Sequence, residues 1–302
     1  MPARNLRKSD QHESPPPLLS SGGGPDGSLP VSVVVISANS AQTIRRCLES
    51  LTIFDEIIVY LNRCTDRTGE LCAEFENVRV IEGEFIGFGP TRNMATSYAR
   101  HPWVLSIDTD EWLGDDLQRA IQKIDFTDSN RAYSVRRRHM VLGKPVTVGG
   151  VGRRKHVRLY HRDTGKYDSK PVHEKVVLKA GIRPTLLSER LWHDQGDRDR
   201  EHFSIDSPAY GVSYAEQHPG KKAIHPGMAL LRAWATFFKR FVLQAGFLAG
   251  WRGILIAHHA AHSVFVKHTA HYVQTRADGR ADHRAETADL KDSEPNVTVG
   301  HE

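Results

Sequence analysis

Residues 31–37 form a continuous run of mostly β-branched side chains, Val-Ser-Val-Val-Val-Ile-Ser, which is typical of a strand covered on both faces. A helix is expected directly after this run, because Ile44, Leu48 and Leu51 recur at i, i+4 and i+7. Three further apolar runs alternate with helical patterns, at residues 56–61, 78–81 and 103–107. Because strands that alternate with helices are normally joined as parallel crossovers, the sequence predicts an α/β fold with a Rossmann-like, mostly parallel sheet.

The pattern of the chain changes after residue 131. Short β-like pieces separated by glycine and proline favour an antiparallel or mixed lobe beside the parallel sheet, at residues 132–136, 156–160, 171–178 and 186–192. In the first half, Pro90 is expected at the first position of a helix over residues 91–100, where proline costs no intrahelical hydrogen bond. Residues 1–29 and 276–302 are too polar to bury a core, so we expect a disordered leader and a disordered tail.

Helical patterns return between residues 198 and 275. Within them Leu231, Trp234 and Phe238 form an apolar stripe with arginine and lysine beside it. This stripe fits two alternatives, ordinary packing against the rest of the protein or an interfacial helix on an anionic membrane leaflet. No uncharged apolar run reaches the roughly 18 residues that a membrane-spanning helix needs.

Composition narrows the range of partners and compartments. The formal charge of +5 and the pI near 9.1 favour an acidic partner, such as nucleic acid, a nucleotide or an anionic membrane. The basic runs at 136–138 and 153–155 lack interleaved aromatic residues, so no nucleic-acid partner is expected. Three cysteines without metal-ligand spacing indicate a reducing compartment, and no apolar signal-peptide region precedes Pro15.

The apolar run at residues 104–107 stops abruptly in three carboxylates, Asp108, Asp110 and Glu111. Carboxylates at the end of a buried strand are costly unless a cation meets them. In open α/β sheets, ligands bind beyond the carboxyl ends of the strands, which is where these residues are expected. Asp108 and Asp110 therefore form a candidate site for a divalent cation, Mg²⁺ or Mn²⁺, that would neutralise a diphosphate.

Five motifs in order resemble the family 2 glycosyltransferases, and most closely the branch that includes lipopolysaccharide-core β-1,4-glucosyltransferases. The likeness covers roughly residues 31–195, and the order of the motifs is more specific than any one of them. The motifs are Ser32 to Ser37 with Asn39, Asp55 to Val59, Cys64 to Thr68, Gly87 to Gly89 with Arg92-Asn93, and Ser106 to Glu111.

This resemblance implies a GT-A fold, a nucleotide-sugar donor that is usually a UDP-sugar such as UDP-glucose, a divalent metal ion, and inversion at the anomeric carbon. On matching positions, Ser37 and Asn39 would line the nucleotide pocket, and Arg92 would approach the base or the phosphates. Asp108 would face the ribose and the metal region, and Asp110 would ligate the ion. A guanidinium and a cation suit a nucleoside diphosphate leaving group, whose negative charge develops during the transfer.

An inverting transfer needs a general base that takes the proton from the acceptor hydroxyl. The branch that the chain resembles carries a Val-His-Glu stretch in its second lobe, and this chain has Val172-His173-Glu174. Glu174 is therefore the first candidate for the base. Glu111 and Asp197 compete with it.

Two positions depart from the family pattern. Ser40 follows Asn39 where the family often has an acidic residue, and Leu61 stands where an aspartate usually recognises uracil. Asn62 is then the candidate to supply a hydrogen bond to the base from the neighbouring position. These departures keep an alternative open, a non-catalytic, membrane-associated binding protein of the same fold. A nucleotidyltransferase of similar build is the alternative among enzymes.

The sequence therefore predicts an inverting glycosyltransferase with a lipopolysaccharide-core, other envelope glycan or lipid-linked acceptor. It is expected in the cytoplasm, at the inner face of the cytoplasmic membrane. The expected catalytic domain covers residues 30–197, with a nucleotide-sugar half over about 30–130 and an acceptor lobe over about 131–197. Residues 198–275 are the expected helical, membrane-associated region.

Overall fold

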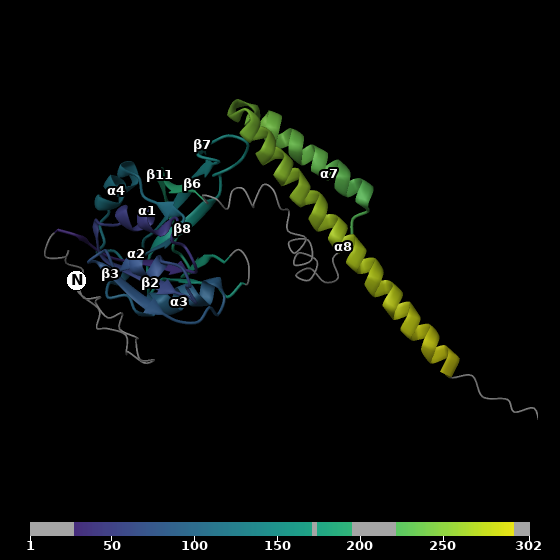
Figure 1. The fold of residues 1–302 in the computed structure, drawn as a ribbon, viewed down its shortest axis with the longest axis horizontal. Helices are drawn as coiled ribbons and strands as arrows, with labels where there is room; N and C mark the ends of the chain where they lie inside the picture. Colours follow the sequence, from purple (N-terminus) through teal and green to yellow (C-terminus); the bar gives the residue numbers. More distant parts are fainter. Residues whose placement is uncertain (1–26, 171–173, 195–221, 293–302) are drawn as a thin grey trace, which may run out of the picture. The chain divides into compact units, whose positions relative to one another are not determined.

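The computed structural model describes residues 27–170, 174–194 and 222–292 (Figure 1). These residues form two compact units. The first unit takes in the described residues up to 147 and from 151 to 194, and the second takes in 148–150 and 222–292.

The first unit is built from short strands and helices that alternate in its N-terminal half. Its strands are β1 (Leu29–Ser37), β2 (Phe54–Leu61), β3 (Val78–Glu82), β4 (Trp103–Asp108), β5 (Glu111–Trp112), β6 (Ala132–Val141), β7 (Lys144–Val146), β8 (Lys155–His161), β9 (Gly165–Tyr167), β10 (Val176–Leu178) and β11 (Thr185–His193). Its helices are α1 (Ile44–Glu49), α2 (Thr68–Cys72), α3 (Phe88–Ser97) and α4 (Asp115–Gln122).

Nine of the described strands form one sheet in the order β3-β2-β1-β4-β8-β6-β11-β5, with β7 paired to β6. The strands from β3 to β4 are parallel, as the alternating pattern predicted. Beyond β4, β8 runs antiparallel to both of its neighbours, and β11 is parallel to β6. The antiparallel strands were expected as a lobe beside the parallel sheet, but they continue the same sheet, because β8 pairs with the free edge of β4. Only β9 and β10 form a separate, two-stranded sheet among the described residues.

The parallel half of the sheet is buried on both faces, which explains the unbroken apolar run of β1. Val33 and Val35 pack with α1, α2 and α4 on one face, and Val34 packs with α3 on the other. Figure 1 shows α1 and α4 on the side of the sheet opposite to α3. Side chains of successive residues point to opposite faces of a strand, so β-branched residues at each position fill both layers.

Helix α3 begins earlier than the sequence predicted. It covers Phe88–Ser97 in place of the expected 91–100, and Pro90 is its third residue. Gly87 adopts a φ of +102°, a conformation that favours glycine, and its carbonyl accepts a hydrogen bond from the backbone N–H of Thr91. Proline is tolerated anywhere in this first turn, because those N–H positions have no intrahelical acceptor.

The second unit is a helical hairpin. It consists of α7 (Pro226–Phe238), the short helices η1 (Lys239–Leu243) and η2 (Gly246–Ala249), and α8 (Trp251–Asp292). Figure 1 shows α7 running alongside the first part of α8. The helices approach closely at small residues: Ala229 and Ala233 of α7 are buried, as are Ala257 and Ala261 of α8.

Helix α8 corrects the prediction of a disordered tail from residue 276. The helix continues to Asp292, and residues 293–302 lie outside the described part of the chain. Residues 276–292 contain four alanines and three arginines, which have high helix propensity, although the polarity of the segment suggested a tail. Within the expected leader, β1 already begins at Leu29, and residues 1–26 lie outside the description. None of the described helices is both long and apolar enough to cross a membrane.

Candidate active site

Asp108 is the last residue of β4, and its carboxylate is bound by three arginines from three other elements. Its Oδ2 accepts hydrogen bonds from Arg137 of β6 at 2.6 Å and from Arg158 of β8 at 2.8 Å. Its Oδ1 accepts a hydrogen bond from Arg92 of α3. The strand order brings these residues together, because β8 pairs with β4 and β6 pairs with β8.

Glu111 shares two of these arginines and is completely buried. Both of its carboxylate oxygens accept hydrogen bonds from Arg158 at 2.8 Å, and its Oε2 also accepts one from the backbone N–H of Asp108 at 2.9 Å. Arg137 donates to Glu111 through its Nε. Glu111 was a candidate general base. It has no exposed surface and its oxygens are occupied, so an acceptor hydroxyl has no room beside it. We therefore assign Glu111 to positioning the arginines and the turn after β4.

The charges in this network decide the ionisation of Asp108. Burial opposes its ionisation, but the positive charges of Arg158, Arg92 and Arg137 outweigh burial and hold the pKa of the Asp108 carboxyl well below its usual range. Asp108 is thus an anion that binds guanidinium groups, and it fixes the position of all three arginines at the end of β4.

Asp110 lies in a different environment. Burial, with the negative charges of Asp108 and Glu111, raises the pKa of Asp110 to about 7. Its Oδ2 lies 3.5 Å from Nε2 of His193, the last residue of β11. The ring Nδ1 of His193 is buried without a hydrogen-bond partner among the described residues. A carboxylate in a negative environment next to a histidine is a pair that can ligate a divalent cation.

The predicted metal pair, Asp108 and Asp110, therefore fits a divalent cation only in part. Asp110 has no guanidinium partner in the described structure and has His193 beside it, whereas both oxygens of Asp108 are bound by arginines. No cluster of three or more His, Cys, Asp or Glu side chains suited to a metal ion occurs among the described residues. The protein's own donors at this position are thus Asp110 and His193, and a bound ion would need further ligands from a substrate or water.

An apolar cavity of about 270 Å³ lies at the carboxyl ends of β1 and β2. It is lined by Ile36, Ser37, Ala38, Tyr60, Asn62, Phe85, Phe88 and Thr91. The rings of Phe85 and Phe88 meet edge to face, with 5.0 Å between their centroids. The hydroxyl of Ser37 is buried and has no hydrogen-bond partner among the described residues, so it is available to a ligand in this cavity.

The predicted donor-binding residues divide between this cavity and the structure around it. Ser37 and Asn62 line the cavity. Asn39 adopts a φ of +51°, and its side-chain oxygen accepts hydrogen bonds from the backbone N–H groups of Thr65 and Asp66, so it fixes the loop after β2. Arg92 is buried beside Asp108 and does not line the cavity.

The two departures from the family pattern also have structural explanations. Leu61 packs into the core on the α1 side of the sheet, so its side chain contributes to folding. The hydroxyl of Ser40 accepts a hydrogen bond from Thr109 at 3.1 Å, and its backbone N–H donates to Thr68. Leu61 therefore contributes to the core, and Ser40 links the loop after β1 to the turn after β4.

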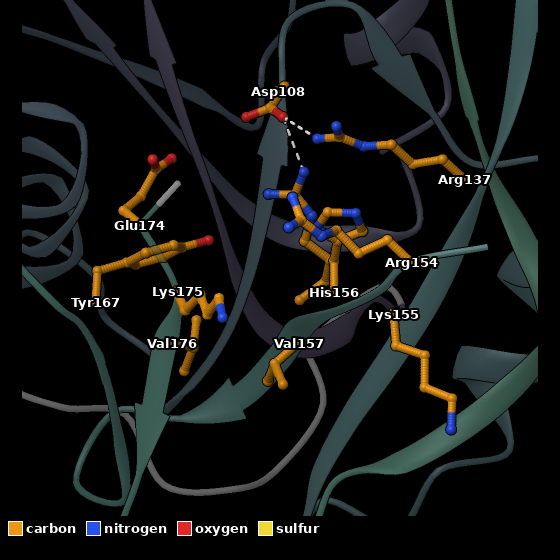
Figure 2. Close-up of a pocket in the computed structure, with 11 residues that line it drawn as sticks. Asp108, Arg137, Arg154, Lys155, His156, Val157, Tyr167, Glu174, Lys175 and Val176 are labelled. Carbon is orange, nitrogen blue, oxygen red and sulfur yellow. Dashed lines mark hydrogen bonds and ion pairs between the residues drawn. The ribbon is translucent and has the colours of Figure 1, made fainter. Parts of the chain in front are cut away.

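A second cavity, of about 370 Å³, begins at Asp108 and is strongly cationic (Figure 2). It is lined by Asp108, Arg137, Arg154, Lys155, His156, Val157, Arg158, Tyr167, Glu174, Lys175 and Val176. Figure 2 shows Glu174 and Tyr167 on one side of this cavity, with Arg137 and Arg154 on the other. Glu174, the predicted general base, lines this cavity and lies 3.8 Å from the Nε of Arg92. Val172, His173 and Asp197 lie outside the described residues.

Sequence reasoning missed two residues of the site, Arg158 and His193. Arg158 alternates with the apolar Val157 and Leu159 along β8, which is a strand signal. Its neighbours in space became known only when β8 was paired with β4. His193 follows Trp192 at the end of β11, and only the pairing of β11 with β5 brings it to the turn that carries Asp110.

The family model for glycosyl transferase family 2 matches residues 32–185, slightly more than half of the 302-residue chain. The chain therefore belongs to the family 2 glycosyltransferases, as the order of its motifs predicted. The predicted GT-A type α/β fold is confirmed as well, with a parallel half, a mixed second half and C-terminal helices.

Two relatives give the range of similarity. The lipopolysaccharide core biosynthesis glycosyltransferase LpsC of Rhizobium meliloti is 28% identical over 180 residues, which cover 54% of this chain and 67% of LpsC. The uncharacterized glycosyltransferase RP128 of Rickettsia prowazekii is 28% identical over 241 residues, which cover 74% of this chain and 80% of RP128.

Among solved structures, S. aureus TarS 1–349 in complex with UDP-GlcNAc is 18% identical and has a TM-score of 0.40, with 82% of this chain and 92% of that chain covered. Of a longer TarS chain, this protein spans 45%.

Proposed function

We propose that this protein is an inverting, metal-dependent glycosyltransferase that moves a sugar from a UDP-sugar, such as UDP-glucose, to a lipopolysaccharide-core or other envelope glycan or lipid-linked acceptor. The observation that carries the proposal is the position of the two cavities. The apolar cavity at Ser37 lies at the end of β1, the cationic cavity begins at the end of β4, and these two strands are neighbours in the sheet. A donor and an acceptor bound there would meet beside Asp108.

The apolar cavity has the dimensions and the chemistry for a nucleobase. Phe85, Phe88 and Tyr60 offer aromatic surface, and the unpartnered hydroxyl of Ser37 offers one hydrogen bond. The amide of Asn62 donates to the carbonyl of Gly83, so its own oxygen is available to accept a hydrogen bond from the base. Uracil, with an N–H donor flanked by carbonyl oxygens, matches this pair.

Asp110 and His193 would hold the divalent cation. A bound cation would supply positive charge to the diphosphate as it leaves. The chain's own contribution is to place the Asp110 carboxylate in a negative environment without a guanidinium partner, next to the His193 ring at 3.5 Å. Asp108 contributes by holding Arg92, Arg137 and Arg158 at the end of β4.

Glu174 would act as the general base. In the transfer, the acceptor oxygen bonds to the anomeric carbon of the sugar and the bond from that carbon to the β-phosphate oxygen of UDP breaks. The proton of the acceptor hydroxyl passes to Glu174, and UDP leaves. Attack from the side opposite to the phosphate inverts the anomeric carbon. The guanidinium of Arg92 lies 3.8 Å from the Glu174 carboxylate, so the two side chains are held next to each other at the start of the cavity.

The helical hairpin supports action next to a membrane. Four large apolar side chains, Leu231, Trp234, Leu243 and Leu248, are each between 62% and 71% exposed. The arginine and lysine residues beside this apolar stripe suit an anionic leaflet. Together with the similarity to LpsC, this surface supports an envelope glycan or lipid-linked acceptor at the inner face of the cytoplasmic membrane.

The proposal is tested with purified full-length protein, a panel of nucleotide sugars, and Mg²⁺ or Mn²⁺. We expect metal-dependent binding of UDP by calorimetry and slow hydrolysis of one UDP-sugar. Asp110→Asn should weaken UDP binding in the presence of metal. Glu174→Gln should keep UDP affinity within about twofold and lower turnover by about 10² or more. The matched control is Glu70→Gln, at a carboxylate that is 66% exposed in α2 and should change neither quantity.

Three outcomes would contradict the proposal. The first is no binding of any nucleotide sugar with either metal while Asp110→Asn changes nothing. The second is release of pyrophosphate from a nucleoside triphosphate, which would identify a nucleotidyltransferase. The third is UDP-sugar binding with no turnover on any envelope glycan, which would favour a non-catalytic binding protein.

A further inference from the structure

The cationic cavity contains more positive charge than its carboxylates balance. In and directly behind its wall at Asp108, three guanidinium groups face three carboxylates: Arg92, Arg137 and Arg158 against Asp108, Glu111 and Glu174. These six groups form one network of ion pairs with no net charge. Any further cation that lines the cavity is therefore in excess.

Arg154 and Lys175 are the cations in excess. Both line the cavity, both are exposed, and neither side chain has a hydrogen-bond or ion-pair partner within the described parts of the chain. They come from opposite sides of the cavity, since Arg154 precedes β8 and Lys175 precedes β10. Figure 2 shows the head group of Arg154 directed toward the middle of the cavity and the amino group of Lys175 beside Val176, whereas the amino group of Lys155 points away.

The third polar group at this position is neutral. Burial, followed by the positive charges of Arg137 and Arg158, lowers the pKa of His156 to about 4. At neutral pH the His156 ring thus offers a hydrogen bond and no charge. The cavity therefore presents two free positive charges, one neutral hydrogen-bonding ring and the Glu174 carboxylate.

We infer that this cavity binds an acceptor that carries a phosphate group next to the hydroxyl that receives the sugar. A phosphate monoester has a charge of about −1.5 to −2 at pH 7, which matches the two free cations, and its oxygens accept the N–H donors of arginine and lysine. The inference rests on the proposed function, because Glu174 marks this cavity as the acceptor side. The cavity proposed for the nucleobase has no cationic side chain in its lining.

The experiment measures binding of glucose 6-phosphate and of glucose to the full-length protein by calorimetry. Saturating UDP and Mg²⁺ are present throughout, so that the donor site is occupied and cannot take up the phosphate. We expect glucose 6-phosphate to bind and glucose to bind at least about tenfold more weakly, because charge-assisted hydrogen bonds to the phosphate are lost. The double variant Arg154→Ala/Lys175→Ala should lose about tenfold or more in affinity for glucose 6-phosphate, and Arg154→Lys should retain most of the affinity.

The matched control is Arg153→Ala, at an exposed arginine that neighbours Arg154 but does not line the cavity. It should leave the affinity within about twofold, since a surface charge contributes little to binding. The affinity for UDP, measured separately, should be the same in all variants. Melting temperatures should also be unchanged, because the substituted side chains are exposed.

The inference is overturned if glucose binds as tightly as glucose 6-phosphate, or if Arg153→Ala loses as much affinity as the double variant. It is also overturned if the double variant weakens UDP instead, because the cations would then serve the donor's diphosphate. Failure of UDP itself to bind the wild-type protein would count against the proposed function, so the two hypotheses fail in different measurements.

Discussion

Replacing Arg158 with methionine tests the claim that the end of β4 is held by a buried ion network. The Arg158 side chain is 6% exposed and makes contacts of 2.8 Å with Asp108 and with both oxygens of Glu111. Methionine fills a similar volume, so the main effect is loss of charge. Two carboxylates then remain in the interior with fewer cations.

The expected loss in the free energy of unfolding follows from the arginine partners that each carboxylate keeps. Removing one partner of a buried ion pair typically costs about 3–5 kcal/mol. Asp108 would keep Arg92 and Arg137, and Glu111 would keep Arg137. We therefore expect a loss at the lower end, about 3 kcal/mol in the free energy of unfolding. For a domain of this size, that loss lowers the melting temperature by about 6–12 °C.

The assay is equilibrium urea unfolding monitored by tryptophan fluorescence. The control is Arg45→Met, which removes an ion pair with Glu74 whose side chains are 45% and 48% exposed, and it should cost far less stability than Arg158→Met because water screens an exposed pair. The double variant Arg158→Met/Glu111→Gln should be less destabilised than the sum of the two single variants, since it removes a charge together with its partner. If Arg158→Met costs no more than the control, the ion network does not stabilise the fold as argued.

The same variant has a predictable pH dependence. The folded-state pKa of Asp108 lies below the unfolded value of about 3.9, so its ion pairs stabilise the fold above that pH. That contribution is lost as pH falls through the depressed folded-state pKa. The difference in stability between wild type and Arg158→Met should therefore be full at pH 7 and should narrow in acid. A difference that widens in acid would contradict the assigned charges.

Three further variants address other parts of the chain. Gly89→Ala should cost about 1–3 kcal/mol in urea unfolding, because its Cβ would lie 1.9 Å from the carbonyl oxygen of Asp168. Gly69→Ala should cost less, because its Cβ would lie 3.4 Å from Cδ1 of Leu61. Glu56→Gln should cost about 2 kcal/mol or more in the free energy of unfolding, since this 2% exposed carboxylate accepts three hydrogen bonds. The affinity for UDP should not change, because Glu56 lies near the start of β2 and away from the site. Trp234→Ala should weaken binding to vesicles that contain phosphatidylglycerol by about tenfold in a sedimentation assay. It should not lower stability, since the side chain is 67% exposed. Unchanged binding would argue against the hairpin as a membrane contact.

The parallel half of the fold could be predicted from the sequence because its signals are local. The β-branched run of β1 and the spacing of Ile44 and Leu48 each report burial of a single element. The placement of β8 and β11 could not be predicted, because strand pairing depends on contacts between residues far apart in the chain. The length of helix α8 was underestimated, since its polar C-terminal part has helix propensity without an apolar period.

The same difference between local and long-range signals separates the residues of the candidate site. Asp108, Asp110 and Glu174 could be predicted from motif order, because each lies in a short conspicuous segment. Arg158 and His193 come from strands whose neighbours are set by tertiary pairing, and neither carries a local motif. Sequence alone also does not show which polar groups are already engaged: the side-chain oxygen of Asn39 accepts hydrogen bonds from the loop after β2.

The stacked indoles of Trp112 and Trp192 have a consequence for the kinetics of ligand capture. Their planes lie 6° apart with 5.5 Å between centroids, and the guanidinium groups of Arg46 and Arg138 lie over them. The pair joins β5 to β11, and the backbone N–H of Asp194 donates to the carbonyl of Asp110, so the turn at Asp110 is fastened at both ends. A ligand arriving at this turn would meet donors that are already in place, so the turn would lose little conformational entropy on binding and would not have to rearrange first.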